Sequence, residues 1–372
     1  MQHDPKCSTI QRKEDQIEEC VDLVVVDLFC GAGGFSTGVD LSGHSVDLAF
    51  DTDPHMLSLH HLNFPKAKHV LMKLGGKVDT FGSALLGYVG GRPWHLHGSP
   101  PCQSFSIANR MNGNYSEIGD DERCNLSYWY LDLVQWVNTS SNPPKSWSME
   151  QVPTARKFVE ERHPWLKEAL HYDVFGWEFG APTLRRRMFK GGGWGFAPTH
   201  ARPSKRTRDS FAFNLPCVAD VIPPPYDLPA TKVAIRGAKN NFSKVKGELK
   251  NRKVRSELGE NLRTFDRPCY SILASQALQV WTHDDVQEDS TILWQKRGTL
   301  SPDDAKRIQG FPAAYQIEVT ETKLVSYPSI SAVLSDTPDP IITRKIAAKH
   351  KTKAIGNSVV PLIAMNLFQN LA

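Results

Sequence analysis

The sequence places a cysteine on a proline-rich loop, where its thiol could act as a nucleophile. The loop, Ser99-Pro100-Pro101-Cys102-Gln103-Ser104, follows a short segment from Trp94 to His97 that is typical of a strand. The prolines fix backbone dihedral angles just before Cys102, and an accessible thiolate on such a rigid loop is suited to covalent catalysis. Most free cysteines are instead small buried apolar residues. By itself the loop favours this second interpretation.

A second loop, Asp27-Leu28-Phe29-Cys30-Gly31-Ala32-Gly33-Gly34, is rich in glycine and follows an apolar run. Glycine lets a backbone approach a ligand closely. The dinucleotide-binding pattern would have a third glycine at position 36, where this chain has Ser36. Asp51 and Asp53 lie about 20 positions further on, where an acidic residue can hold ribose hydroxyls. The loop predicts a nucleoside-bearing cofactor; the alternative is a turn that only packs a helix on a strand.

The elements around these loops alternate between strands and helices. Val21 to Phe29 reads as a strand buried on both faces, and a helix to Leu41 follows the glycine turn. A strand from Val46 to Phe50 then leads to a helix from Asp53 to Pro65. This order predicts the start of a doubly wound α/β sheet. Further elements are expected as a helix over Leu126–Val137 and strands over Trp147–Val152 and Tyr172–Trp177.

Composition excludes several classes of protein. Apolar residues make up 40% of the 372 positions and charged residues 23%, as in a globular chain. The sequence has no apolar run long enough for a transmembrane helix, and its charged N-terminus does not resemble a signal peptide. Seven cysteines without a CxxC pair argue against a disulfide framework and a structural zinc site. We expect an intracellular protein with free thiols and no membrane association.

Basic charge is concentrated in one segment. Between Ala201 and Arg263, 14 Lys/Arg against 6 Asp/Glu give +8, which leaves −4 for the rest of a chain whose total is +4. Such a segment is typical of a surface that binds a polyanion. A solvated lysine-rich loop explains the same charge equally well.

Several motifs together resemble those of the DNA (cytosine-5)-methyltransferase family. The glycine loop and Pro100-Pro101-Cys102-Gln103 are the first two, and Glu150-Gln151-Val152 stands where the family has Glu-Asn-Val. The later segments that are similar to family motifs are Gly180–Arg187, Arg267-Pro268 with Leu300–Pro302 and Gln309–Pro312, and Gly356–Val359. They occur in the family's order and extend over most of the chain.

The resemblance implies a catalytic role for four residues. Cys102 would add to C6 of cytosine, which makes C5 nucleophilic. Glu150 would meet N3 of the ring and offset the charge that this addition creates. Arg185 and Arg187 would contact the base carbonyl and the catalytic loop, while Arg186 is a candidate for phosphate binding.

The same resemblance implies S-adenosyl-L-methionine as methyl donor and no metal. Phe29 would lie against the adenine, Gly31 and Gly33 would line the methionine end, and Asp51 would hold the ribose, with Asp53 as a second candidate. The residues expected to close this pocket are Pro101, Asn357 and Val359.

The resemblance also predicts the domains and the partner. Residues 1–22 would form a polar tail and residues 23–197 a Rossmann-like catalytic domain. Residues 198–265 would form a smaller, loop-rich target-recognition domain, whose C-terminal boundary lies between 265 and about 310. Residues 266–372 would form the C-terminal part, with the last motif (354–372) returning to the catalytic domain. The expected partner is double-stranded DNA, with the target base flipped out of the duplex. We expect a monomer of the stand-alone modification type, with a cognate restriction endonuclease as a further partner.

The chain departs from the family pattern at several positions, and two alternative functions within the family stay open. The departures are Lys73, Ser99, Gln151, Thr183, Val360 and a long segment from Gln316 to Lys353. One alternative is a tRNA cytosine-5 methyltransferase, although the Cys-Phe-Thr signature of that branch is absent. The other is a family member that binds DNA without catalysis, and the retained Cys102, Glu150 and Arg185 argue against it.

Overall fold

A computed structural model describes residues 23–102, 105, 122–202, 215–236, 262–272, 278–283, 295–318, 322–343 and 346–372. The predicted polar tail, residues 1–22, lies outside this part of the chain. Among the helices that are described, none is both long enough and apolar enough to cross a membrane.

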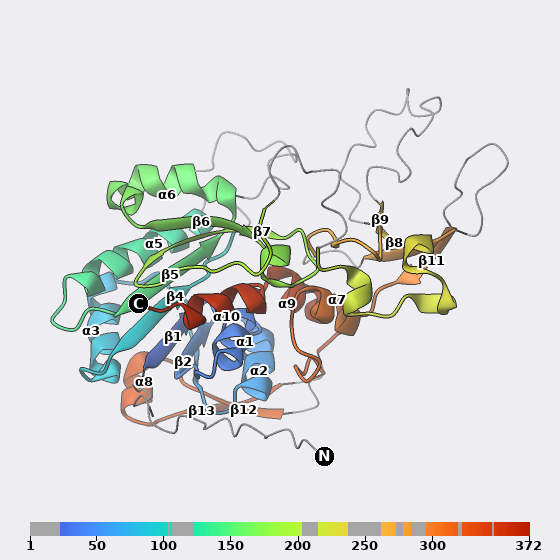
Figure 1. The fold of residues 1–372 in the computed structure, drawn as a ribbon. Helices are drawn as coiled ribbons and strands as arrows, with labels where there is room; N and C mark the ends of the chain where they lie inside the picture. Colours follow the sequence, from blue (N-terminus) through green and yellow to red (C-terminus); the bar gives the residue numbers. More distant parts are fainter. Residues whose placement is uncertain are drawn as a thin grey trace, which may run out of the picture.

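A seven-stranded sheet forms the centre of the fold (Figure 1). Its strands are β1 (Val24–Leu28), β2 (Leu48–Asp51), β3 (Lys68–Leu71), β4 (Trp94–Gly98), β5 (Ser146–Gln151), β6 (Leu170–Phe175) and β7 (Arg186–Gly192). The spatial order is β3-β2-β1-β4-β5-β7-β6, and β7 alone in this sheet runs antiparallel to its neighbours. The predicted doubly wound α/β class is confirmed. Because the order reverses at β1, the loops after β1 and β4 border the crevice where such sheets bind ligands.

Helices cover both faces of the sheet (Figure 1). They are α1 (Gly34–Leu41), α2 (Pro54–Asn63) and α10 (Pro361–Gln369) on one face, and α3 (Val78–Val89), α5 (Glu122–Asn138) and α6 (Arg156–Arg162) on the other. Short 3-10 helices complete this part at η1 (Pro153–Ala155), η2 (Pro164–Lys167) and η3 (Gly176–Phe179). Alternation along β1 sends Val24, Val26 and Leu28 to the core under α3 and α5, and Val25 to the core under α1 and α10.

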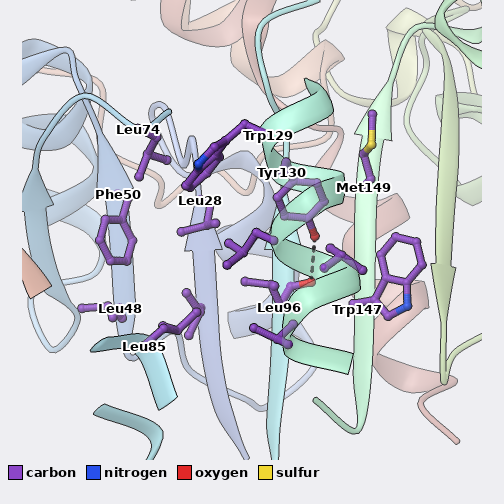
Figure 2. Close-up of a cluster of buried hydrophobic side chains, with 14 of the residues drawn as sticks. Leu28, Leu48, Phe50, Leu74, Leu85, Leu96, Trp129, Tyr130, Trp147 and Met149 are labelled. Atoms are coloured by element: carbon purple, nitrogen blue, oxygen red, sulfur yellow. Dashed lines mark hydrogen bonds between the residues drawn. The ribbon is translucent and has the colours of Figure 1, made fainter. Parts of the chain in front are cut away.

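Figure 2 shows the first of these two cores. Leu28, Leu48 and Phe50 from the sheet pack with Leu85 of α3 and Trp129 of α5. The buried hydroxyl of Tyr130 does not lack a hydrogen-bond partner, because it donates to the carbonyls of Ser148 and Leu96 in a shared hydrogen bond. This packing fixes the strands whose ends carry the candidate site.

A second, antiparallel sheet has the order β11-β10-β8-β9 and lies beside the first (Figure 1). Its strands are β8 (Val233–Arg236), β9 (Leu262–Thr264), β10 (Gln279–Thr282) and β11 (Gln295–Thr299). The helices around it are η5 (Val218–Asp220), η6 (Pro225–Asp227), η7 (Ala230–Lys232) and α7 (Pro302–Ile308). Much of the predicted target-recognition segment, residues 203–214 and 237–261, lies outside the described residues, and the domain boundaries stay a prediction.

The segment from Gln316 to Lys353, which the sequence left unassigned, covers an edge of the central sheet. It contains β12 (Thr322–Ser326), α8 (Ile330–Leu334), β13 (Asp339–Thr343) and most of α9 (Ala348–Asn357). Tyr327, just after β12, pairs with β3: its amide donates to His69 (2.7 Å) and its carbonyl accepts from Leu71 (2.9 Å). This contact occupies backbone groups that an edge strand would otherwise expose.

Candidate active site

Cys102 lies on the loop that leaves β4, and side chains from the end of β5 and from η1 hold this loop in place. The thiol is free and half-buried. The Gln151 amide donates to the carbonyls of Pro100 (2.9 Å) and Pro101 (3.4 Å). The Thr154 hydroxyl donates to the carbonyl of Phe105 at 2.5 Å. The backbone is therefore fixed on both sides of the cysteine, and Gln151, a departure from the family's Asn, makes one of these contacts.

Glu150 is placed beside the Cys102 loop by the pairing of β5 with β4, in which Met149 lies opposite Gly98. The residue is 5% exposed, and its Oε1 lies 2.8 Å from Nε of Arg187. Arg187 is itself largely buried, because its side chain is only 12% exposed. The two charges compensate each other, as a buried pair requires.

Arg185 is the most deeply buried charge of the group. It is 2% exposed, and its Nη1 donates to the carbonyl of Gly356 at 2.8 Å. Its Nε has no hydrogen-bond partner among the described residues. Burial, with a smaller contribution from Arg187, lowers the pKa of Arg185 to about 9, while Glu150 and Cys102 favour its charged form. The four predicted catalytic residues thus form one electrostatic cluster, with an N–H group left for a further acceptor.

The side chains of Thr183 and Arg186 make structural contacts, and among the described residues neither forms a hydrogen bond or ion pair with a side chain of this cluster. Thr183, where the family has Gln, accepts a hydrogen bond from the Arg185 amide at 3.3 Å. Its bridge to Cys269 ties the arginine segment to the chain that follows β9. Arg186 points to the opposite side of β7 from Arg187 and pairs with Asp173 at 2.7 Å. A phosphate at Arg186 would compete with that carboxylate.

The glycine loop after β1 adopts an unusual backbone conformation. Phe29, Gly31 and Gly33 all have positive φ, at 62°, 53° and 89°. A Cβ on Gly31 would meet no atom within 4 Å, whereas one on Gly33 would lie 2.5 Å from the Phe64 ring. Open space therefore lies next to Gly31. The half-buried Phe29 ring meets Trp129 edge-on at 6.5 Å.

The two candidate ribose-binding carboxylates differ in their surroundings. Asp51 Oδ2 accepts from the Gly31 amide and Oδ1 from the Asp53 amide, both at 2.8 Å. Burial raises the pKa of Asp51, and these backbone hydrogen bonds oppose that rise. Asp53 caps α2 through the His55 amide (3.0 Å) and pairs with Lys353 at 3.2 Å. Asp51 thus joins the glycine loop, while Asp53 is occupied by a helix end and a lysine.

The last motif packs against the glycine loop. A Cβ on Gly34 would lie 2.3 Å from the carbonyl of Val359, so glycine is required for this contact. Val359 is buried at 4% exposure, whereas Asn357 is exposed at the end of α9. Val360 is buried and Pro361 takes the first position of α10. The fold therefore brings Ser358 and Val359 beside the loop, and the roles of Asn357 and Val359 in closing a cofactor pocket stay a prediction.

Sequence reasoning missed a buried polar chain behind the glycine loop. Ser36 donates to Asp27 (2.7 Å) and contacts His60 Nε2 (2.8 Å), and His60 Nδ1 lies 2.9 Å from His69 Nε2. Burial raises the pKa of Asp27 to about 8 and lowers that of His69 to about 3. Ser36, the residue that breaks the dinucleotide pattern, was the signal that could have indicated this chain.

Comparison with known proteins agrees with this geometry. The model of the family "C-5 cytosine-specific DNA methylase" matches residues 23–332. Type II methyltransferase M1.HphI of Haemophilus parahaemolyticus is 30% identical over 181 residues, 45% of each chain. Type II methyltransferase M.XorII of Xanthomonas oryzae pv. oryzae is 30% identical over 199 residues, 49% of this chain and 43% of the relative. The matched stretch therefore spans less than half of either relative.

Solved structures share the fold at low sequence identity. Entamoeba histolytica methyltransferase EhMeth aligns with a TM-score of 0.53 at 14% identity, over 93% of this chain and 97% of that one. Dnmt2 methyltransferase of S. pombe gives the same TM-score, identity and coverage. With the family match over most of its length, the chain belongs to the C-5 cytosine-specific DNA methylase family.

Proposed function

We propose that the chain transfers a methyl group from S-adenosyl-L-methionine to carbon 5 of cytosine in double-stranded DNA. The observation that carries this proposal is the cluster of Cys102, Glu150, Arg185 and Arg187 beside the glycine loop. A thiol, a carboxylate and two guanidiniums are the groups that covalent activation of a pyrimidine requires.

The residues around the glycine loop fit S-adenosyl-L-methionine. The open space at Gly31 leaves room for a ligand that approaches the backbone closely. Phe29 offers a half-exposed ring for a base, and Asp51 offers lone pairs for ribose hydroxyls beside the amide that already fixes it. When bound, the donor supplies an electrophilic methyl group. Val359 borders the same loop at Gly34, and Pro101 and the exposed Asn357 are proposed to complete the pocket.

Each residue of the cluster has a defined part in the proposed reaction. The Cys102 thiolate would add to C6 of a flipped-out cytosine, which would make C5 nucleophilic toward the methyl group of the donor. Arg187 holds Oε1 of Glu150, which leaves Oε2 to share a proton with N3 of the ring as the addition places negative charge there. Arg185 directs its unpaired N–H toward the cytosine carbonyl, where it offsets the charge that builds during addition. Transfer of the C5 proton to a base, with water as the simplest acceptor, would then break the C6–S bond, release the Cys102 thiolate and restore the ring.

The second sheet and the basic segment around it are proposed to hold the duplex. Phosphate contacts there would set affinity and base contacts would set the recognition sequence. By similarity to the type II relatives, we propose a monomeric modification enzyme that acts with a cognate restriction endonuclease in the cell interior.

The test is bisulfite sequencing of unmethylated DNA after incubation with the purified protein and S-adenosyl-L-methionine. Protection of cytosines in one short sequence context is expected, and it should be absent with Cys102→Ser. Cys217→Ser is the matched control, because Cys217 is also free and half-buried but lies outside the cluster. Methyl transfer to tRNA alone, measured with tritiated donor, would assign the chain to the RNA-modifying alternative. Donor binding without transfer to either nucleic acid would contradict catalysis.

A further inference from the structure

Ser99 connects the loop of the nucleophile to the loop of the cofactor. Its hydroxyl donates to the carbonyl of Phe29 at 3.1 Å, and its amide donates to the carbonyl of Leu28 at 3.2 Å. The second bond continues the pairing of β1 with β4, which ends at Leu28 and Gly98. The first bond exists only because residue 99 carries a hydroxyl, and the family's usual glycine could not make it.

The residue that receives this bond has a strained backbone. Phe29 has a φ of 62°, in the left-handed region that costs a non-glycine residue about 1–2 kcal/mol. Such a conformation persists only where the surroundings fix it. The Cys30 amide, which donates to Phe50 at 2.9 Å, fixes the far side of Phe29, and Ser99 fixes its carbonyl.

On the other side, Ser99 is three residues from the nucleophile along a stiff path. Pro100 and Pro101 leave little freedom between Ser99 and Cys102. The Gln151 amide holds the carbonyls of both prolines. A displacement of the Phe29 carbonyl would therefore move the Ser99 hydroxyl that is bonded to it, and the stiff loop would pass this movement on to Cys102.

We propose that Ser99 is a positioning residue that couples occupation of the cofactor site at Phe29 to the reactivity of the Cys102 thiol. The inference rests on the proposed function, because it takes S-adenosyl-L-methionine to be the ligand at Phe29. Coupling between two sites is reciprocal. Loss of the Ser99 hydroxyl should therefore change both the response of the Cys102 thiol to the ligand and the affinity of the chain for the ligand.

The experiment measures two quantities without DNA and without turnover. Calorimetric titration gives the affinity for S-adenosyl-L-homocysteine, and mass spectrometry gives the rate of Cys102 alkylation by iodoacetamide with and without that ligand. The variants are Ser99→Ala and the conservative Ser99→Thr, which keeps the hydroxyl. Ser140→Ala is the matched control, because the Ser140 hydroxyl also donates to a backbone carbonyl (Val137, 2.7 Å) but lies at the end of α5.

In the unaltered chain the ligand should change the alkylation rate of Cys102. In Ser99→Ala the rates with and without the ligand should be nearly equal. The affinity of Ser99→Ala should drop about two- to tenfold, the range for one neutral hydrogen bond. Ser99→Thr should restore both quantities, and Ser140→Ala should match the unaltered chain. A ligand response in Ser99→Ala equal to that of the unaltered chain would overturn the coupling while leaving the proposed function intact. Failure of the unaltered chain to bind the ligand would overturn both, and absence of methyl transfer with the coupling present would overturn the function alone.

Discussion

Asp27 gives the fold an unusual dependence on pH. The side chain is fully buried at the end of β1, and its hydrogen-bond donor is the Ser36 hydroxyl. Burial raises its pKa from 3.8 to about 8. Asp27→Asn keeps the shape and the acceptor for Ser36, and it removes the titration.

The size of the effect follows from the two pKa values. Between pH 3.8 and about pH 8 the folded protein keeps a proton that the unfolded chain has released. Because folding binds this proton, the free energy of unfolding decreases as pH rises. One pH unit corresponds to about 1.4 kcal/mol, so Asp27 removes about 4 kcal/mol of stability across three units. The Asp27→Asn variant does not lose this stability. Its free energy of unfolding should therefore increase relative to that of the unaltered chain as pH rises.

Urea unfolding at several values from about pH 5 to about pH 8, followed by tryptophan fluorescence, measures this gain. His69 and His95, whose pKa values burial lowers to about 3, destabilise both proteins on the acid side, so the difference between the proteins is the diagnostic quantity. Asp40→Asn, on the exposed end of α1, should run parallel to the unaltered chain. Parallel curves for Asp27→Asn as well would refute the argument that Asp27 is protonated in the fold.

Three further substitutions test other contacts. Thr154→Val removes the hydroxyl that holds Phe105, and we expect kcat to fall about tenfold with little change in KM, while Thr154→Ser restores the rate. Gly31→Ala adds a methyl group to the open space beside Gly31, where φ is 53°. Calorimetry should show that cofactor binding is lost. Thermal unfolding should show that the free energy of unfolding falls by only about 1–2 kcal/mol. Gly38→Ala places a Cβ 2.4 Å from the Pro361 carbonyl, and urea unfolding should show a loss of about 1–3 kcal/mol.

The parts of the fold that the sequence predicted are those with a local signal. The apolar run of β1 and the glycine turn after it indicated the α/β class. The capped helix after Asp53 is present as α2, with Asp53 accepting from the His55 amide. Topology then accounts for the cluster, since the ends of adjacent parallel strands meet at one sheet edge.

The elements that the sequence did not predict depend on distant partners. The segment that forms β7 begins in the arginine motif, and Arg186, Arg187 and Lys190 interrupt the apolar pattern of a buried strand. Lys190 is nevertheless fully buried, with Glu160 2.7 Å from its Nζ. The position of Tyr327 against β3 was equally hidden, because the bridge between residues 70 and 327 is made by backbone groups. The pattern of apolar and polar residues along the sequence therefore predicts neither the burial of Lys190 beside Glu160 nor the pairing of Tyr327 with β3.

Three of the departures from the family pattern, Ser99, Gln151 and Thr183, have a similar role in the structure. Ser99 and Gln151 each bond a backbone carbonyl beside the nucleophile or the cofactor loop, and Thr183 accepts from the amide of Arg185. In each case the substituted side chain holds main chain rather than a reacting atom. Main-chain positions can be held by different side chains as long as a donor or acceptor reaches them. These positions can therefore vary while the cluster keeps its geometry, and the coupling at Ser99 is where such variation is expected to change function rather than only support it.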